Sequence, residues 1–176
     1  MPGTVYKVPP IPADPEHTTY VDAGVLRIGI EYRLLDDAGL AANYQGEAME
    51  EIQAAVDGKT IEDNGVSIHV EAVEDGHEYL RFDCFENEPH YHYIDASGKS
   101  QTIMEFDRVA HGDMITWAIG QLRTRLSVML EYAGGGGIAA RVQPAQVEAA
   151  LEEAERLARK AEKALAGQKR GRGAGP

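Results

Sequence analysis

Segments of alternating apolar and polar residues constrain this chain more than any other feature of its sequence. In residues 25–35, VLRIGIEYRLL, Leu26, Ile28 and Ile30 share one parity, whereas Arg27 and Glu31 share the other. A period of two places successive side chains on opposite faces of a β-strand. The alternation recurs in residues 66–73, 77–85, 90–94 and 100–106. We therefore predict a sheet with one apolar and one polar face.

Short turns between these segments predict how the strands are connected. Asp75-Gly76 separates residues 66–73 from residues 77–85, and residues 95–99, which include Gly98, separate the last two segments. Glycine readily adopts the positive φ that a tight hairpin turn requires. Connections this short join antiparallel neighbours, so we predict an antiparallel meander. Such a sheet commonly buries its apolar face and leaves the polar face solvated.

Beyond Asp107 the apolar residues change to steps of three and four. The residues that follow this spacing are Ile115, Ala118, Ile119, Leu122, Leu126, Met129 and Ala133. This period is typical of an amphipathic helix, and about 20 helical residues span about 30 Å, enough to cover a sheet face. We predict an α+β fold in which an antiparallel β-meander packs under one long α-helix, with a core domain over residues 20–133.

The two ends of the chain differ from this core in composition. Residues 1–19 are rich in proline and predict an extended arm, and residues 134–143 begin with four glycines and predict a flexible joint. Residues 144–166 predict an amphipathic helix whose narrow apolar stripe contains many alanines, and we expect the basic tail, residues 167–176, to be disordered. The stripe can pack on its own sheet or against a second copy. We predict self-association, because the glycine joint frees the helix.

Composition limits the classes of partner. The formal net charge of −12 would repel nucleic-acid phosphates, which leaves only Lys169, Arg170 and Arg172 of the tail as a weak contact. The sequence lacks an apolar run of the roughly 20 residues needed to span a bilayer. Its single cysteine, Cys84, excludes an intramolecular disulfide. We therefore expect a cytoplasmic protein that binds no membrane, and the charge argues against nucleic acid as a partner.

One pair of histidines is the strongest chemical candidate. In EPHYHYID, residues 88–95, His90 and His92 share one face of the predicted strand roughly 7 Å apart, so both imidazoles can reach one ion. Glu88 precedes them at the same parity, and His111 lies just before the long helix; either could complete a site for a divalent transition metal. The alternative, which we favour, is that both rings pack in the core or at an interface with their nitrogens hydrogen-bonded.

The His-x-His spacing of residues 90–92 resembles the pair that cupins and several metallohydrolases use to bind a metal. The resemblance covers these residues alone, because the downstream glutamate and histidine of a cupin are missing. It therefore implies a metal-binding pair and does not assign the chain to either family.

The sequence contains neither a Gly-x-Ser-x-Gly elbow nor a phosphate-binding glycine loop, and we predict no catalytic residue and no bound cofactor. We predict a small cytoplasmic, oligomeric accessory protein that self-associates through residues 144–166 and contacts a protein partner through the apolar side chains of its N-terminal arm. The first alternative is a metal-binding protein or metal-dependent enzyme that uses His90 and His92. A weaker alternative is nucleic-acid binding through the tail.

Overall fold

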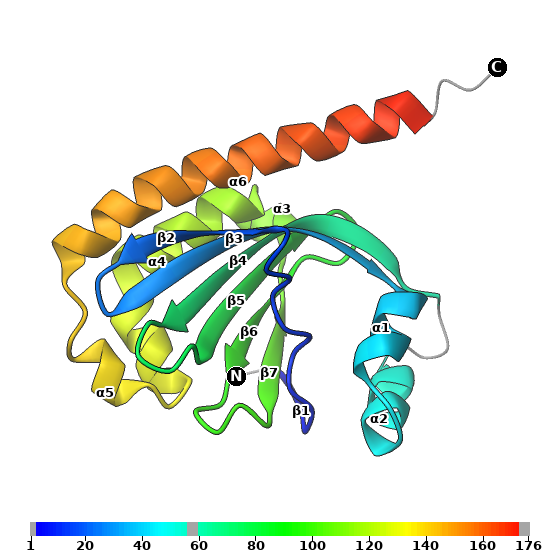
Figure 1. Ribbon diagram of the computed structural model, residues 1–176, viewed down its shortest axis with the longest axis horizontal. Helices are drawn as coiled ribbons and strands as arrows, with labels where there is room; N and C mark the ends of the chain where they lie inside the picture. Colours follow the sequence, from blue (N-terminus) through cyan, green and yellow to red (C-terminus); the bar gives the residue numbers. More distant parts are fainter. Residues whose placement is uncertain (1–2, 56–59, 173–176) are drawn as a thin grey trace.

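The computed structural model describes residues 3–55 and 60–172, and it confirms the α+β class predicted from the sequence (Figure 1). In these residues the strands are β1 (Thr4–Tyr6), β2 (Thr18–Ala23), β3 (Leu26–Asp36), β4 (Glu62–Ala72), β5 (Glu78–Phe85), β6 (His90–Ile94) and β7 (Gln101–Glu105). The helices are α1 (Asp37–Asn43), α2 (Glu47–Ala55), α3 (Arg108–His111), α4 (Met114–Tyr132), α5 (Gly136–Ala139) and α6 (Pro144–Arg172).

The described strands form one seven-stranded antiparallel sheet in the order β1-β7-β6-β5-β4-β3-β2. From β2 to β7 each strand pairs with the next, which is the predicted meander. The predicted turns form at Gly76 and Gly98, whose φ angles are 73° and 69°. The alternation did not reveal β1 or β2.

The strand order carries the N-terminal arm across the sheet. Because β1 pairs with β7 at one edge and β2 lies at the other, residues 7–17 connect the two edges across one face. Six strand spacings of about 4.8 Å amount to about 29 Å, and eleven extended residues reach about 36–40 Å. The prolines of this segment favour the extended backbone that the crossing needs. Val8 is 3% exposed, so the arm is packed on the body of the protein.

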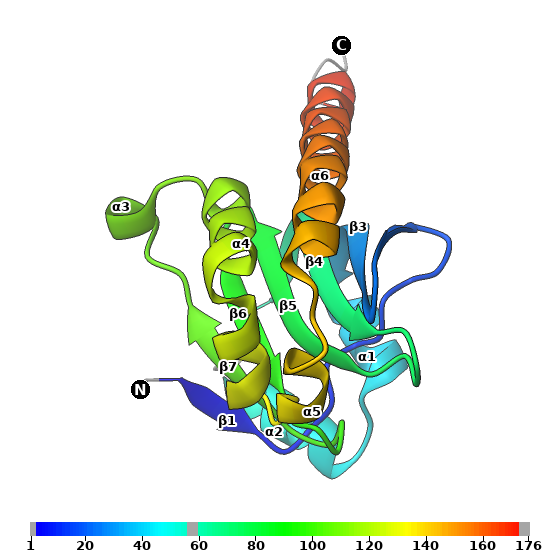
Figure 2. The same cartoon turned by 90° about the vertical axis from the view of Figure 1, so that its left-hand side faces the viewer.

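Helices α4 and α6 lie side by side on the apolar face of the sheet (Figure 2). Helices α1 and α2 lie on the other side of the sheet (Figure 2). The core joins Ile68 and Phe82 of the sheet to Leu122 of α4 and Leu151 of α6, all nearly inaccessible to solvent. The apolar stripe of α6 therefore packs on its own sheet, which is one of the two arrangements that the sequence left open. Self-association through residues 144–166 stays a prediction.

The segments that flank α6 also differ from expectation. Within the glycine-rich joint, α5 buries Ile138 and Ala139 against the core, so this segment is packed rather than free. Helix α6 continues to Arg172, beyond its predicted end at residue 166, and its C-terminal part projects past the other helices (Figure 1). Residues 1–2 of the predicted arm and 173–176 of the predicted tail lie outside the described residues. In the described part of the chain, none of the helices has the length and apolar character needed to cross a membrane.

The polar face of the sheet is covered, and the expectation of a solvated face was wrong. The crossing arm and helices α1 and α2 form a second layer, with a small apolar cluster around Val8, Leu40 and Tyr44. The buried charged or ionisable side chains of the sheet include Glu31, His69, Arg81, Asp83 and His92. Burial of so many charges is costly unless each finds a partner, and their pairing defines the site described next.

Candidate metal centre

A row of ion pairs connects side chains of β3, β4 and β5 on the covered face, and positive and negative charges alternate along it. Arg33 contacts Glu31 at 2.9 Å, and Glu31 contacts His69 at 2.8 Å. His69 in turn lies 2.6 Å from Glu78, which forms a 2.5 Å ion pair with Arg81. Every member of this chain of charges has an oppositely charged neighbour. The burial cost is thereby offset within the network.

The position of His69 makes its ring a cation. Both ring nitrogens face carboxylate oxygens, so each nitrogen must carry a proton to donate. Burial lowers the pKa of His69, but its hydrogen bonds to Glu31 and Glu78 outweigh burial and raise the pKa above its usual value. Burial likewise opposes ionisation of Glu78, yet Arg81 and His69 hold the pKa of that carboxyl far below normal. Each charge in this network is balanced by a partner within it, and we assign the network a structural role.

A second cluster on the same face consists of one carboxylate and two histidines. Asp83 of β5 lies opposite His90 of β6 in the strand register, and His92 follows His90 on that face of β6. The Nε2 atom of His92 is 2.9 Å from Asp83 Oδ2, and the Nε2 atom of His90 is 3.4 Å from the same oxygen. The donor atoms of these side chains all lie within 4.8 Å of one another. Strand pairing has thus brought two imidazoles and one carboxylate to a single point.

The other polar atoms of this cluster are already occupied. His92 Nδ1 donates to Gln101 Oε1 at 2.7 Å, and Gln101 Nε2 donates to the carbonyl of Val8, which fixes the orientation of the amide. His90 Nδ1 donates to the carbonyl of Glu88 at 2.7 Å. Both rings are therefore held with Nδ1 protonated and Nε2 directed at the same carboxylate. Asp83 uses its second oxygen, Oδ1, to accept a hydrogen bond from the Ser67 hydroxyl.

This arrangement leaves a gap in the hydrogen bonding at Asp83 Oδ2. A neutral imidazole carries one N–H, and here that proton is at Nδ1, so each Nε2 presents a lone pair to a carboxylate oxygen. The conflict is removed by a second proton on each ring or by a cation between the three atoms. Two protons would place two positive rings 4.8 Å apart, centroid to centroid, in a largely buried site. Such a pair of like charges is unfavourable.

The pKa shifts in the cluster reflect the same conflict. Burial lowers the pKa of His92 below its usual value in spite of Asp83. Burial also acts to lower the pKa of His90, but the contact with Asp83 outweighs it and raises that pKa. For Asp83 burial favours the neutral acid, yet hydrogen bonds from the two histidines hold the pKa of its carboxyl well below normal. These shifts keep Asp83 anionic and make His90 the more basic of the two rings.

The spacing of the three donor atoms suits a transition metal. Ligands bound about 2.1 Å from an ion are separated by about 3.0 Å in octahedral and about 3.4 Å in tetrahedral geometry. The Nε2–Oδ2 distance of His90, 3.4 Å, equals the tetrahedral separation, and that of His92, 2.9 Å, lies just below the octahedral one. Metal-binding histidines also commonly donate their second ring N–H to a carbonyl or carboxylate, as His90 and His92 do here. The cluster therefore has both the ligands and the supporting hydrogen bonds of a mononuclear site.

The structure brings together two of the four ligands predicted from the sequence. His90 and His92 share a face and converge, as expected. The side chain of Glu88 is exposed, and that residue contributes its backbone carbonyl to His90 instead. His111 is also exposed and stacks near Phe106 and Trp117, with ring centroids 5.6 and 5.8 Å away. Glu88 and His111 are therefore not part of the cluster.

Asp83 is the member of the cluster that sequence reasoning missed. It lies on the polar parity of residues 77–85, and the turn at residues 86–89 pairs it with His90. The sequence does place Asp83 on the polar face of its strand. Combined with the correct pairing of the two strands, this would have predicted that Asp83 lies opposite His90. Pro89 made that register uncertain, because proline interrupts regular strand pairing.

A cavity of about 630 Å³ adjoins the cluster and is lined by Asp83, His90 and His92. Its polar wall continues to Arg33 and Arg81, and its other walls come from the crossing arm and from α1 and α2. Cavities of this size accommodate small organic molecules.

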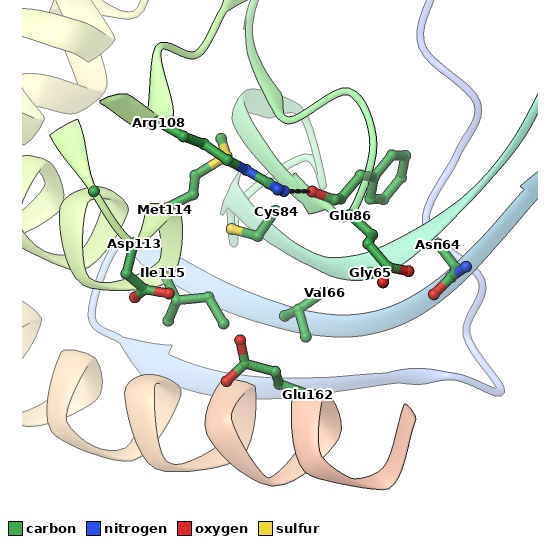
Figure 3. A pocket seen from close by; sticks show the side chains of 12 residues that line it. Asn64, Gly65, Val66, Cys84, Glu86, Arg108, Asp113, Met114, Ile115 and Glu162 are labelled. Atoms are coloured by element: carbon green, nitrogen blue, oxygen red, sulfur yellow. Dashed lines mark hydrogen bonds between the residues drawn. The ribbon is translucent and has the colours of Figure 1, made fainter. Parts of the chain in front are cut away.

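Another cavity, of about 380 Å³, lies between the N-terminus of α4, the side of α6 and the end of β5 (Figure 3). Arg108 donates to the carbonyl of Phe85 there, and Asp113 caps α4 by accepting from the Thr116 amide. Burial raises the pKa of the Cys84 thiol far above its usual value, so that thiol stays protonated and is a poor nucleophile. The groups around this cavity are occupied by structural contacts.

The fold and the site together define an α+β protein with a His-His-Asp cluster buried between an antiparallel sheet and a covering arm. The chain belongs to the family described as a domain of unknown function, DUF7700, whose model matches residues 20–158. The match includes Asp83, His90, His92 and Gln101 and leaves out the crossing arm. No curated protein and no solved structure matches this chain.

Proposed function

We propose that this protein binds one divalent transition-metal ion through Asp83, His90 and His92. The observation that carries the proposal is the convergence of both Nε2 atoms on one carboxylate oxygen while both Nδ1 atoms are committed as donors. Two imidazoles and one carboxylate form a ligand set used for Zn²⁺ and for non-haem Fe²⁺, with positions left for water or a substrate. The cavity beside the cluster is consistent with such open positions.

A purely structural reading of the cluster is the main competitor. In the neighbouring network every charge has a complementary partner, and His69 shows what a structural histidine looks like on this face. At Asp83 the hydrogen-bond donors and acceptors match only if both rings take a second proton, which places two positive rings side by side, or if a cation lies between the three atoms. This contrast between two histidine sites on one sheet supports metal binding over packing alone.

The test is elemental analysis of the purified protein after incubation with Zn²⁺, Fe²⁺, Mn²⁺ or Co²⁺ and removal of unbound ion. We expect about one equivalent of one of these metals per wild-type chain. We expect loss of that metal in Asp83→Asn and His92→Ala, because each change removes a ligand. In Gln101→Ala we expect metal affinity to fall by about 10- to 100-fold, because the ring of His92 loses its orienting partner.

The matched controls are Glu88→Ala and His111→Ala, which remove the two sequence-predicted donors that lie outside the cluster. Both should retain the wild-type metal content, and circular dichroism should show that all variants are folded. Wild-type protein that binds none of the four metals would contradict the proposal. So would folded Asp83→Asn protein that retains a full equivalent.

The interaction role predicted from the sequence is a separate proposal. A cytoplasmic accessory protein could also hold a metal, so the two roles are compatible.

A further inference from the structure

We infer that the cavity beside Asp83, His90 and His92 binds a small organic anion whose acidic group coordinates the metal and whose apolar body lies against the arm and helices α1 and α2. The inference rests on the proposed metal site and names the chemical class of its ligand. The metal end of the cavity is positively charged once a metal is bound, and the opposite walls are largely apolar.

The metal end of the cavity favours an anion. A divalent ion with two neutral imidazoles and the single carboxylate of Asp83 keeps a net charge of +1. Arg81 lies opposite His92 in the register of β5 and β6, and it lines the same cavity. Its Nε and Nη2 atoms donate to Glu78, and Nη1 makes no hydrogen bond to the described residues. An incoming carboxylate would neutralise the metal site and could accept from Nη1.

The remaining walls favour an apolar body. Leu35 lies on the same face of β3 as Arg33, and Ile103 lies opposite His92 in the register of β6 and β7. The arm and the helices add further branched side chains to the lining, namely Ile11, Leu40 and Ile52. A ligand that carried only charge would leave this apolar surface in contact with water. The combination selects a carboxylate with an aromatic or branched hydrocarbon part.

Water-soluble inorganic anions and cationic ligands fit the cavity less well. Inorganic anions are small and lack an apolar part to fill a volume of about 630 Å³. A cationic ligand would meet the positively charged metal site with Arg33 and Arg81 beside it. The lining also contains the carboxylates of Asp63, Glu88 and Glu105, so the preference for an anion comes from the metal itself. Each arginine already forms an ion pair with a glutamate. This pairing weakens the attraction of the arginine for an anion but does not reverse it.

The test is optical titration of the Co²⁺-loaded protein with benzoate, because the visible spectrum of Co²⁺ responds to a change in its ligands. Acetate supplies the same acidic group without the ring, and benzyl alcohol supplies the ring without the charge. We expect benzoate to shift the spectrum with an affinity at least about tenfold higher than acetate, since it buries additional apolar surface. Benzyl alcohol should leave the spectrum unchanged.

A pair of variants on α2 locates the apolar wall. Ile52→Ser should reduce the preference for benzoate over acetate while leaving the affinity for acetate unchanged, because Ile52 lines the cavity. Gln53→Ser, at an exposed position of the same helix, should retain the wild-type preference.

Two failures are distinguishable in this experiment. If the protein takes up none of Zn²⁺, Fe²⁺, Mn²⁺ and Co²⁺, both the metal site and this inference are wrong. If it takes up another of these metals but not Co²⁺, calorimetric titration of the protein loaded with that metal makes the same comparison of benzoate, acetate and benzyl alcohol. If Co²⁺ binds in stoichiometric amount but benzoate is no better than acetate, or benzyl alcohol shifts the spectrum equally, the metal site stands and the inference is overturned.

Discussion

His69 and His92 lie on the same face of the sheet, yet their neighbours give the two rings different charges. His69 donates from both nitrogens to carboxylates and is a cation, whereas burial favours a neutral His92. The alternation predicted only that His90 and His92 share one face of their strand. Neither it nor any other local pattern reveals the protonation of His69 and His92, because that depends on Glu31, Glu78 and Gln101, which come from other strands.

At the residue scale, the raised pKa of His69 predicts a pH dependence of stability. A raised folded pKa stabilises the fold fully below the unfolded value of about 6.5, and the contribution is lost as pH rises through the folded pKa. We expect the free energy of unfolding to fall above about pH 6.5, with a slope from this group of at most about 1.4 kcal/mol per pH unit. The measurement is urea denaturation across pH 5 to 9 in the presence of a chelator.

In His69→Gln this contribution should vanish, and the variant should lose about 3–5 kcal/mol at neutral pH because two buried carboxylates lose their partner. His17→Gln changes a histidine whose side chain is 59% exposed, so it should have little effect at any pH. A His69→Gln variant with wild-type stability and the wild-type pH profile would show that the ring is not held as a cation.

At the scale of elements, α6 shows how one pattern is compatible with two kinds of packing. Its narrow stripe of leucine and alanine is typical of helix pairing, and the same small side chains allow close approach to a sheet. Contacts outside the stripe fix the helix in place: Arg159 pairs with Asp113, the N-cap of α4, and Arg123 of α4 pairs with Glu148. The sequence predicted the helix and its buried face, whereas the neighbour that covers that face comes from the tertiary structure.

If α6 packs within its own chain, Leu151→Ala should lower the free energy of unfolding by about 2–5 kcal/mol, because Leu151 is fully buried between α6 and the sheet. Glu152→Ala, at the next and exposed position, should change it by no more than about 0.5 kcal/mol. Chemical denaturation measures both. An unfolding midpoint for wild type that rises with protein concentration would indicate that the helix is instead stabilised by a second copy.

At the scale of the whole molecule, the sheet separates two layers of unequal size. One layer, α4 and α6, belongs to the main core, and the other consists of the arm, α1 and α2 around a small cluster that includes Val8, Leu40 and Tyr44. The smaller layer covers the His-His-Asp cluster and the cavity. Any ligand that enters the cavity has to pass between or beside these covering segments, so their stability bears on function.

We expect amide hydrogens of residues 37–55, in α1 and α2, to exchange at least about tenfold faster than those of α4, because fewer apolar side chains hold these helices to the sheet. Hydrogen–deuterium exchange followed by mass spectrometry resolves these peptides. Binding of Co²⁺ and benzoate should slow exchange in α1 and α2 selectively. Equal rates in both layers would show that the protein opens only as one unit.

The sequence by itself determined the antiparallel strands, the two long helices and the apolar face, because side-chain periodicity records which way each residue points within its own element. It also identified His90 and His92 as a pair. Only the tertiary structure decided that the polar face is covered, that α6 packs on its own sheet, and that Asp83 rather than Glu88 or His111 completes the cluster. These features depend on contacts between segments far apart in the chain, and local periodicity contains no information about which distant segment becomes the neighbour.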